Sequence, residues 1–203
     1  MRKLINIFQI VIITILLSHS VYAGSKSDLQ LGIAEAKKGN LLEARKLFES
    51  YLESYPNSGR ALRGLGNTYL LIENDVEKAL EYYRLAWNVG DVESLAQMTA
   101  LYLSYKEKYD DELNKIEDDL RLNSSKNHQV AMALMALADK KNDKELFLHA
   151  YSSIKVRNFE KPDNVKAVVY LLKKFGFDDR VGEFEENIRK VHGSKFDEVL
   201  SSH

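Results

Sequence analysis

The stretch that decides the fold is residues 61–102, which read ALRGLGNTYLLIENDVEKALEYYRLAWNVGDVESLAQMTALY. Apolar residues recur there every three or four positions on both sides of a polar run, residues 73–77, as they do along the buried face of an α-helix. After Gly90 the first pattern begins again, with Leu95 where Leu62 stood 33 residues earlier. The stretch therefore indicates a helix pair followed by the first helix of an equivalent pair. Such recurrence is typical of helical repeat proteins, in which neighbouring units bury the apolar face that one unit cannot bury alone.

The composition agrees with a folded, helical protein. Of the 203 residues, 45% are hydrophobic and 29% are charged, a balance that excludes a disordered chain. Proline occurs only at Pro56 and Pro162, and glycine is sparse. Because these two residue types break helices, we expect long helices with short links.

Residues 1–23 have the pattern of a secretory signal peptide. Arg2 and Lys3 precede a mostly aliphatic run, residues 4–17, and Val21-Tyr22-Ala23 supplies small or compact residues for a signal peptidase. We predict cleavage after Ala23. The alternative is an uncleaved membrane anchor, because about twenty apolar residues can just span a bilayer. No later segment is long and apolar enough to cross a membrane, so the mature chain is predicted to have no transmembrane segment.

Charge and cysteine content limit the classes of partner and the cellular compartments that are compatible with the sequence. Removing residues 1–23 removes two basic residues and no acidic one, so 27 Lys and Arg face 30 Asp and Glu, and the net charge becomes −3. This charge argues against nucleic acid as a partner, because a surface that neutralises phosphates needs a concentrated excess of Lys and Arg. Cysteine is absent, whereas eukaryotic secreted domains of this size usually contain disulfides. We therefore predict a bacterial protein that is periplasmic or secreted.

Residues 29–102, about two and a half units, resemble the tetratricopeptide repeat, and the second unit is similar to the Sel1-like variant of that family. The residues that carry the resemblance are small or apolar, and they are Leu31, Gly32, Ala44, Phe48, Pro56, Leu65, Gly66, Tyr69, Ala79, Tyr83 and Ala86. Gly32 lets the second helix of its unit approach the first, and Phe48 fills the space one turn beyond Ala44. In the turn between them Gly39 provides a left-handed cap and Asn40 an N-cap.

Spacing extends the repeat through the rest of the chain. Ala44 and Ala79 are 35 residues apart, and further steps of 34 reach Leu113, Phe147 and Val181, each at the start of an amphipathic segment. A candidate first helix precedes each of these segments, and the three are residues 95–105, 130–138 and 165–175. The longest predicted links are residues 123–127 and 157–163, the second with a helix start at Pro162.

The predicted fold is all-α, a solenoid of about five antiparallel helix pairs. The family resemblance implies a right-handed superhelix whose concave groove is lined by the first helices. We expect this domain to occupy residues 24–193, with residues 194–203 as a short cap or a frayed end. The alternative is that the C-terminal half, whose motif has drifted, forms a separate small bundle.

No constellation of catalytic residues emerges from the sequence, and we expect no enzyme activity, cofactor or metal. His128, His149, His192 and His203 are scattered over different units without a ligand at zinc-binding spacing. Acidic clusters begin predicted helices at 110–112 and 178–179, where the helix dipole favours negative charge. The tyrosines Tyr69, Tyr82, Tyr83, Tyr102, Tyr105 and Tyr109 are better explained by packing than by stacking on sugars. An enzyme with a degenerate motif is a third and weaker hypothesis.

The remaining candidate site is the groove of the solenoid. Counting from the repeat positions places these partner-binding candidates in it: Lys37, Arg60, Arg63, Asn67, Leu70, Glu93 and Gln97. Arg60, Arg63 and Asn67 could hold a carboxylate or an acidic peptide; the alternative is that the two arginines are ordinary solvated residues. The family's chaperone-tail binders hold a terminal carboxylate at positions where this chain has Leu29, Ile33, Glu93 and Gln97, so that activity is not implied.

The leading hypothesis is therefore a scaffold for protein–protein interaction in envelope assembly, secretion or signalling. The alternative is a module that binds peptidoglycan or an exported polysaccharide through the tyrosines. The partner and the oligomeric state are not determined by the sequence.

Overall fold

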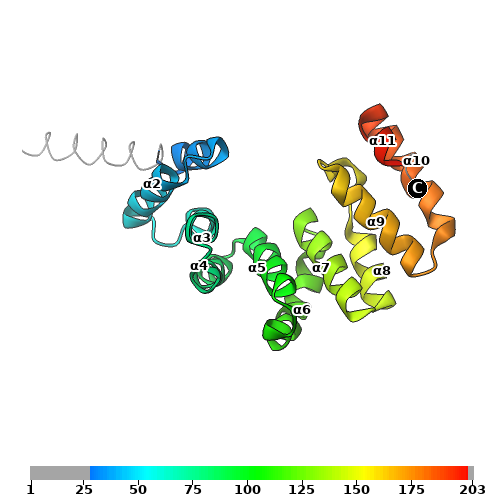
Figure 1. The fold of residues 1–203 in the computed structure, drawn as a ribbon, viewed down its shortest axis with the longest axis horizontal. Helices are drawn as coiled ribbons and strands as arrows, with labels where there is room; N and C mark the ends of the chain where they lie inside the picture. Colours follow the sequence, from blue (N-terminus) through cyan, green and yellow to red (C-terminus); the bar gives the residue numbers. More distant parts are fainter. Residues whose placement is uncertain (1–27, 201–203) are drawn as a thin grey trace, which may run out of the picture. The chain divides into compact units, whose positions relative to one another are not determined.

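The computed structural model describes residues 28–200, and all the regular elements in this range are helices (Figure 1). The predicted signal peptide lies outside the described residues. After a first helix at residues 28–38, the long helices are α2 (Leu41–Ser54), α3 (Gly59–Glu73), α4 (Val76–Asn88), α5 (Val92–Ser104), α6 (Asp110–Ser124), α7 (His128–Lys141), α8 (Lys144–Ser153), α9 (Pro162–Lys174) and α10 (Asp178–His192). The short elements are η1 (Lys106–Tyr109), η2 (Val156–Asn158), η3 (Gly193–Phe196) and α11 (Asp197–Leu200). Within residues 28–200, none of the helices has the length and apolar character needed to cross a membrane.

The predicted all-α repeat of helix pairs is confirmed. The segments expected from the 34-residue spacing to be second helices of a pair are α2, α4, α6, α8 and α10, and the intervening helices are the predicted first helices. The chain divides into two compact units, up to Ser94 and from Leu95. In the first unit α3 packs against both α2 and α4, and in the second α7 packs against α6 and α8.

A left-handed residue recurs in the turn inside four of the five pairs. Gly39 (φ 86°), Asn74 (φ 53°), Asn142 (φ 51°) and Gly176 (φ 75°) occupy equivalent positions at spacings that follow the repeat. The positive φ of Gly39 confirms the predicted cap. Asparagine tolerates this conformation better than most residues with a side chain, so it replaces glycine in the second and fourth pairs.

The residue after the left-handed position occupies the N-cap of the next helix. In the first, second and fourth pairs, its side chain forms one of two kinds of hydrogen bond. Asp75 and Asp143 are true N-caps, since their Oδ1 atoms accept hydrogen bonds from the amides of Lys78 and Leu146, both at 2.9 Å. Asn40 occupies the N-cap position of α2, but the prediction that its side chain caps the helix is wrong. Its Nδ2 instead donates to Glu35 at 2.6 Å, and this bond ties the turn to the preceding helix.

The first of the two long links is shorter than predicted, and the second lies at residues 154–161 rather than 157–163. Helix α6 continues through Asn123 and Ser124, where we expected a link to start, because both side chains are buried and bond to carbonyls of the same helix, those of Asp119 (2.8 Å) and Arg121 (2.9 Å). Part of the second link is the 3₁₀ helix η2. Pro162 is the first residue of α9, as predicted.

The core of the first unit depends on close contacts at glycines. A Cβ atom on Gly32 would lie 2.8 Å from the Phe48 ring, and one on Gly66 would lie 2.5 Å from the Tyr83 ring. Both rings are buried, and Ala44 and Ala79 beside them are fully covered. Leu31 is 45% exposed, so the expectation that it packs in this core is wrong. The face of the first helix that meets the core carries three other apolar residues, Leu29, Ile33 and Ala36.

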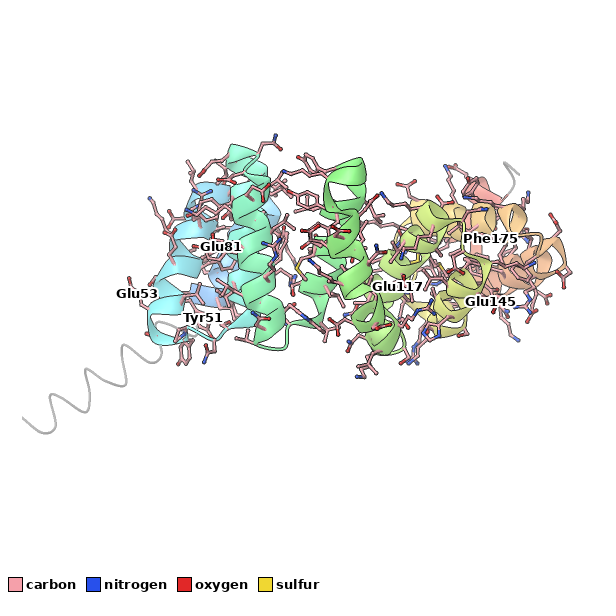
Figure 2. All side chains as sticks on the ribbon, turned by 90° about the horizontal axis from the view of Figure 1, so that it is seen from below. Tyr51, Glu53, Glu81, Glu117, Glu145 and Phe175 are labelled. Carbon is pink, nitrogen blue, oxygen red and sulfur yellow. The ribbon has the colours of Figure 1, made fainter. Side chains whose placement is uncertain are left out.

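The core of the second unit is an aromatic cluster. Phe147 of α8 is fully buried, and its ring centroid lies 5.1 Å from that of Phe175, which follows α9 and is labelled in Figure 2. Rings from Tyr151, Phe184 and Phe159 continue the cluster. Phe196 of η3 is fully buried too, so residues 193–200 pack as a cap on the end of this unit.

Candidate functional site

A groove of about 420 Å³ opens in the first unit, and it is the best candidate site in the described chain. Its walls come from the first helix, α2, α3 and the first turn of α5. The lining residues are Ile33, Ala36, Lys37, Leu41, Phe48, Arg60, Arg63, Gly64, Asn67, Thr68, Leu71 and Glu93. We refer to this site as the groove.

The groove contains five of the seven predicted partner-binding residues: Lys37, Arg60, Arg63, Asn67 and Glu93. Leu70 is half-buried and does not line it, and the adjacent Leu71, 65% exposed, does. Gln97 lies in the part of α5 that belongs to the second unit. Sequence reasoning missed Leu71 because a shift of one residue on a helix turns the side chain by about 100°.

Phe48 forms an apolar part of the groove. The repeat pattern indicates only that it is a core residue, whereas the structure places its ring against two consecutive first helices. A Cβ on Gly64 would lie 2.7 Å from the ring, and one on Gly32 would lie 2.8 Å away. The two glycines therefore leave space for the ring, and Gly64 and Phe48 both line the groove.

Arg63 is held by two carboxylates. Its Nε lies 3.0 Å from Oδ1 of Asp91, and its Nη2 lies 2.6 Å from Oε2 of Glu93. Asp91 also accepts the amide hydrogen of Ser94 in the first turn of α5. Arg63 therefore links α3 to the start of α5, and its charge is already compensated. This arrangement differs from both of our expectations for Arg63, a free anion-binding residue or an ordinary solvated one.

Asn67 is oriented by Tyr83. The hydroxyl of Tyr83 donates to Oδ1 of Asn67 at 2.7 Å. Burial raises the pKa of Tyr83 to about 12, with Arg63 acting in the opposite direction, so the hydroxyl keeps its proton at neutral pH. Because the amide oxygen is occupied, the Asn67 side chain offers its NH₂ group, a hydrogen-bond donor, to a ligand.

Lys37 and Arg60 are the cations of the groove that remain available. Both are exposed, and neither forms a hydrogen bond or an ion pair with another residue in the range 28–200. They come from different helices, the first helix and α3. The groove thus combines two cations without an ion-pair partner with apolar surface from Ile33 and Leu71, above the buried ring of Phe48.

The other features singled out in the sequence have structural explanations. The acidic residues of 110–112 and 178–179 lie in the first turns of α6 and α10, as predicted. Of the tyrosines, Tyr83, Tyr102 and Tyr109 are buried, and Tyr69 stacks on Tyr82 with centroids 5.3 Å apart. No group of three metal-ligating side chains comes together within the described part of the chain.

The histidines differ in their surroundings. His149 is exposed, and its Nε2 lies 3.2 Å from the carbonyl oxygen of Arg121. His128 packs edge-on against Phe159, with centroids 4.9 Å apart, and its two buried ring nitrogens have no hydrogen-bond partner in the described structure. Burial lowers the pKa of His128, opposed by the nearby Glu160. A neutral histidine in an apolar contact is a packing residue.

Comparison with known proteins agrees with the repeat. Residues 26–58 match the family model of the tetratricopeptide repeat. Two solved structures resemble the chain over most of its length. PilF of Pseudomonas aeruginosa superposes with a TM-score of 0.62 at 17% identity, covering 90% of each chain. The MamA protein superposes with a TM-score of 0.53 at 16% identity, covering 85% of this chain and 93% of MamA. This chain has a tetratricopeptide-repeat fold.

The family model matches residues 26–58, and the likeness to the solved structures is one of fold. The similarity of residues 61–90 to the Sel1-like variant stays a prediction. No curated protein matches the sequence.

Proposed function

We propose that the chain is a non-enzymatic, exported scaffold that holds a segment of a partner protein in the groove. The tetratricopeptide fold supports a role in protein–protein interaction, because stacked helix pairs form extended binding surfaces. The processes that we propose for it are envelope assembly, secretion or signalling.

The observation that carries this proposal is the composition of the groove. Apolar side chains and a few convergent polar groups are typical of sites that bind a ligand or a peptide. Leu71, which is 65% exposed, adds an accessible apolar side chain to this lining.

Photo-crosslinking in the producing cells tests the groove. A photoreactive phenylalanine analogue at position 71 is expected to crosslink a protein partner. The matched control is position 42, because Leu42 is also a leucine of the first unit, is also 65% exposed and lies outside the groove. Equal crosslinking at both positions, or none at position 71, would contradict the proposal. The groove variant Asn67→Ala is expected to weaken the crosslink.

We also propose that the protein is exported to the periplasm or secreted after cleavage at Ala23. The support is the sequence of residues 1–23, with its basic start, aliphatic run and compact residues before the cleavage site. Fractionation of the cells followed by N-terminal sequencing is expected to find the mature chain outside the cytoplasm, beginning at Gly24. A chain that keeps residues 1–23 in the membrane fraction would instead identify this segment as an anchor.

A further inference from the structure

We infer that the groove takes an acidic segment of its partner, with an Asp or Glu side chain bound by Lys37 and Arg60 and a neighbouring apolar side chain packed on Ile33 and Leu71. This inference rests on the proposed function, that the groove binds a protein segment. It specifies the chemistry of the partner segment, which follows from charge complementarity with the groove.

The acidic residues of the first unit that lie near the groove in sequence are engaged elsewhere. Glu35 accepts from Lys38 at 2.7 Å and from Asn40, and Glu73 accepts from Arg45. Asp91 and Glu93 share Arg63. Three of the four lining charges of the groove are positive, and the single acid, Glu93, is paired. With Asp91 counted beside Arg63, three cations face two acids, so these groups carry a net charge of 3 − 2 = +1, and Lys37 and Arg60 are the cations without a paired acid.

The positive groove contrasts with the chain as a whole. Residues 24–203 carry three more acidic than basic residues. Two cations without an ion-pair partner on one apolar groove are therefore not a consequence of a basic protein. Opposite charge on a partner segment would attract it to this site and set its register.

The apolar contribution comes from the same groove. Phe48 and Ile33 form part of its lining, and Leu71 stands at it with two thirds of its surface exposed. A volume of about 420 Å³ suits one or two side chains of a peptide. We therefore place an apolar residue of the partner close to its acidic residue.

An acidic side chain fits this site better than a chain terminus. A terminal carboxylate can be captured by free backbone N–H groups or, as the family resemblance implies, by side chains at positions where this chain has Leu29, Ile33, Glu93 and Gln97, none of which is a cation. Most lining residues of the groove, including Ile33, Lys37 and Asn67, lie inside helices, where the backbone N–H groups are bonded to preceding carbonyls. The donors on offer are side chains, the ammonium of Lys37, the guanidinium of Arg60 and the amide of Asn67.

Binding of defined peptides tests the inference. The probes are fluorescent 12-residue peptides with acetylated and amidated ends, which remove terminal charges. One set contains a Leu next to two Glu residues at varied positions, a second has Gln for each Glu, and a third has Ser for Leu. With the protein lacking residues 1–23, we expect Glu peptides to bind at least about tenfold more tightly than their Gln counterparts at low salt. The difference should shrink as salt rises.

Variants of the protein test whether Lys37 and Arg60 cause the preference for Glu peptides. Lys37→Gln combined with Arg60→Gln is expected to remove the preference for Glu, so that the Glu and Gln peptides bind with the same affinity. Leu71→Ser is expected to weaken both sets. The matched control is Lys46→Gln, because Lys46 is an exposed cation of α2 outside the groove, with a side chain 75% exposed.

Three results would overturn the inference. They are equal binding of Glu and Gln peptides, an unchanged Glu preference in the double variant, and an equal loss in the Lys46 control. If any of them is found while position 71 still crosslinks a protein, the acidic partner is wrong and the proposed scaffold function stands. Absence of crosslinks at position 71 would reject the scaffold function itself.

Discussion

The first unit packs its helices through glycines, whereas the second packs them through phenylalanine rings. In the first, Gly32, Gly64 and Gly66 each leave space for a ring of an adjacent helix. In the second, a Cβ atom added to the helical residue Gly182 would meet no neighbouring atom within 4 Å. The contacts between helices are made there by Phe147 and its aromatic neighbours. The same plan of antiparallel pairs is therefore built from two kinds of contact.

The two units also differ in how they compare with known proteins. The match to the tetratricopeptide model, residues 26–58, falls in the glycine-packed unit, whereas the similarity to solved structures covers 90% of the chain. Helices of similar length and turns with left-handed residues are common to both units. Substitutions at the glycine and phenylalanine contacts between helices should affect the stability of the two units differently.

Truncation of the central ring should strongly destabilise the second unit. We expect Phe147→Ala to lower the free energy of unfolding by about 3–5 kcal/mol, because it removes a fully buried ring and leaves a cavity. Urea unfolding followed by circular dichroism measures the change. Tyr170→Ala is the control, since Tyr170 is an aromatic residue of the same unit that is 55% exposed. Similar losses for both variants would show that the cluster is not what holds this unit.

Addition of a methyl group at a helical glycine should destabilise the first unit and stabilise the second. Gly66→Ala is expected to cost about 1–3 kcal/mol, because its Cβ would lie 2.5 Å from the Tyr83 ring and 3.1 Å from the carbonyl oxygen of Ala79. Gly182→Ala is expected to gain about 0.5–1 kcal/mol, since the site is open and alanine favours the helix. Thermal unfolding of the two variants gives the comparison. A gain at Gly66 would reject the close crossing of α3 and α4.

The helix caps should behave alike in both units. Asp75→Ala and Asp143→Ala each remove a carboxylate that accepts a backbone amide at 2.9 Å, and each is expected to cost about 0.5–2 kcal/mol. Chemical denaturation of the two single variants checks this equality. A replacement by Asn, which can still accept the hydrogen bond, should restore most of the loss. Unequal losses would mean that the turns differ more than their geometry indicates.

The smallest expected effect is a loss of stability between pH 7 and pH 5 that His128 causes in the second unit. Burial holds the pKa of His128 below its ordinary value of 6.5, so the unfolded chain binds this proton more readily than the folded chain. Stability from this residue is present above pH 6.5 and is lost as the pH falls below it. Unfolding at pH 7 and pH 5 should show a smaller acid loss for His128→Gln than for wild type. His149→Gln controls for the loss of a histidine, and an unchanged acid loss in His128→Gln would contradict the assignment.

Much of the fold could be predicted from particular residues. The spacing of Ala44, Ala79 and Phe147 placed three second helices, and Gly39 marked a left-handed turn. Asn74 and Asn142 were missed as left-handed residues because asparagine is compatible with many other conformations. The exposure of Leu31 was missed because periodicity gives the faces of a helix but not which face meets a neighbour.

The candidate site was predicted only in part, because the sequence indicates helix faces but not the contacts between helices. Counting along the helices brought Lys37, Arg60, Arg63 and Asn67 to one surface, and the structure places all four around the groove. The pairing of Arg63 with Asp91 and Glu93 did not follow from the sequence, because it joins residues 28 and 30 positions apart through a turn. That pairing changes which cations are free to bind.

The sequence by itself determined the helical repeat, since periodicity, helix breakers and small residues at crossings are local properties written along the chain. Only the tertiary structure decided which charges are compensated, which aromatic rings are buried and which leucine stands at the groove. These depend on distances between side chains far apart in sequence. A shift of one residue along a helix therefore decides whether a leucine lines the groove. A few ångströms between side chains decide whether a cation is paired within the fold or available to a partner.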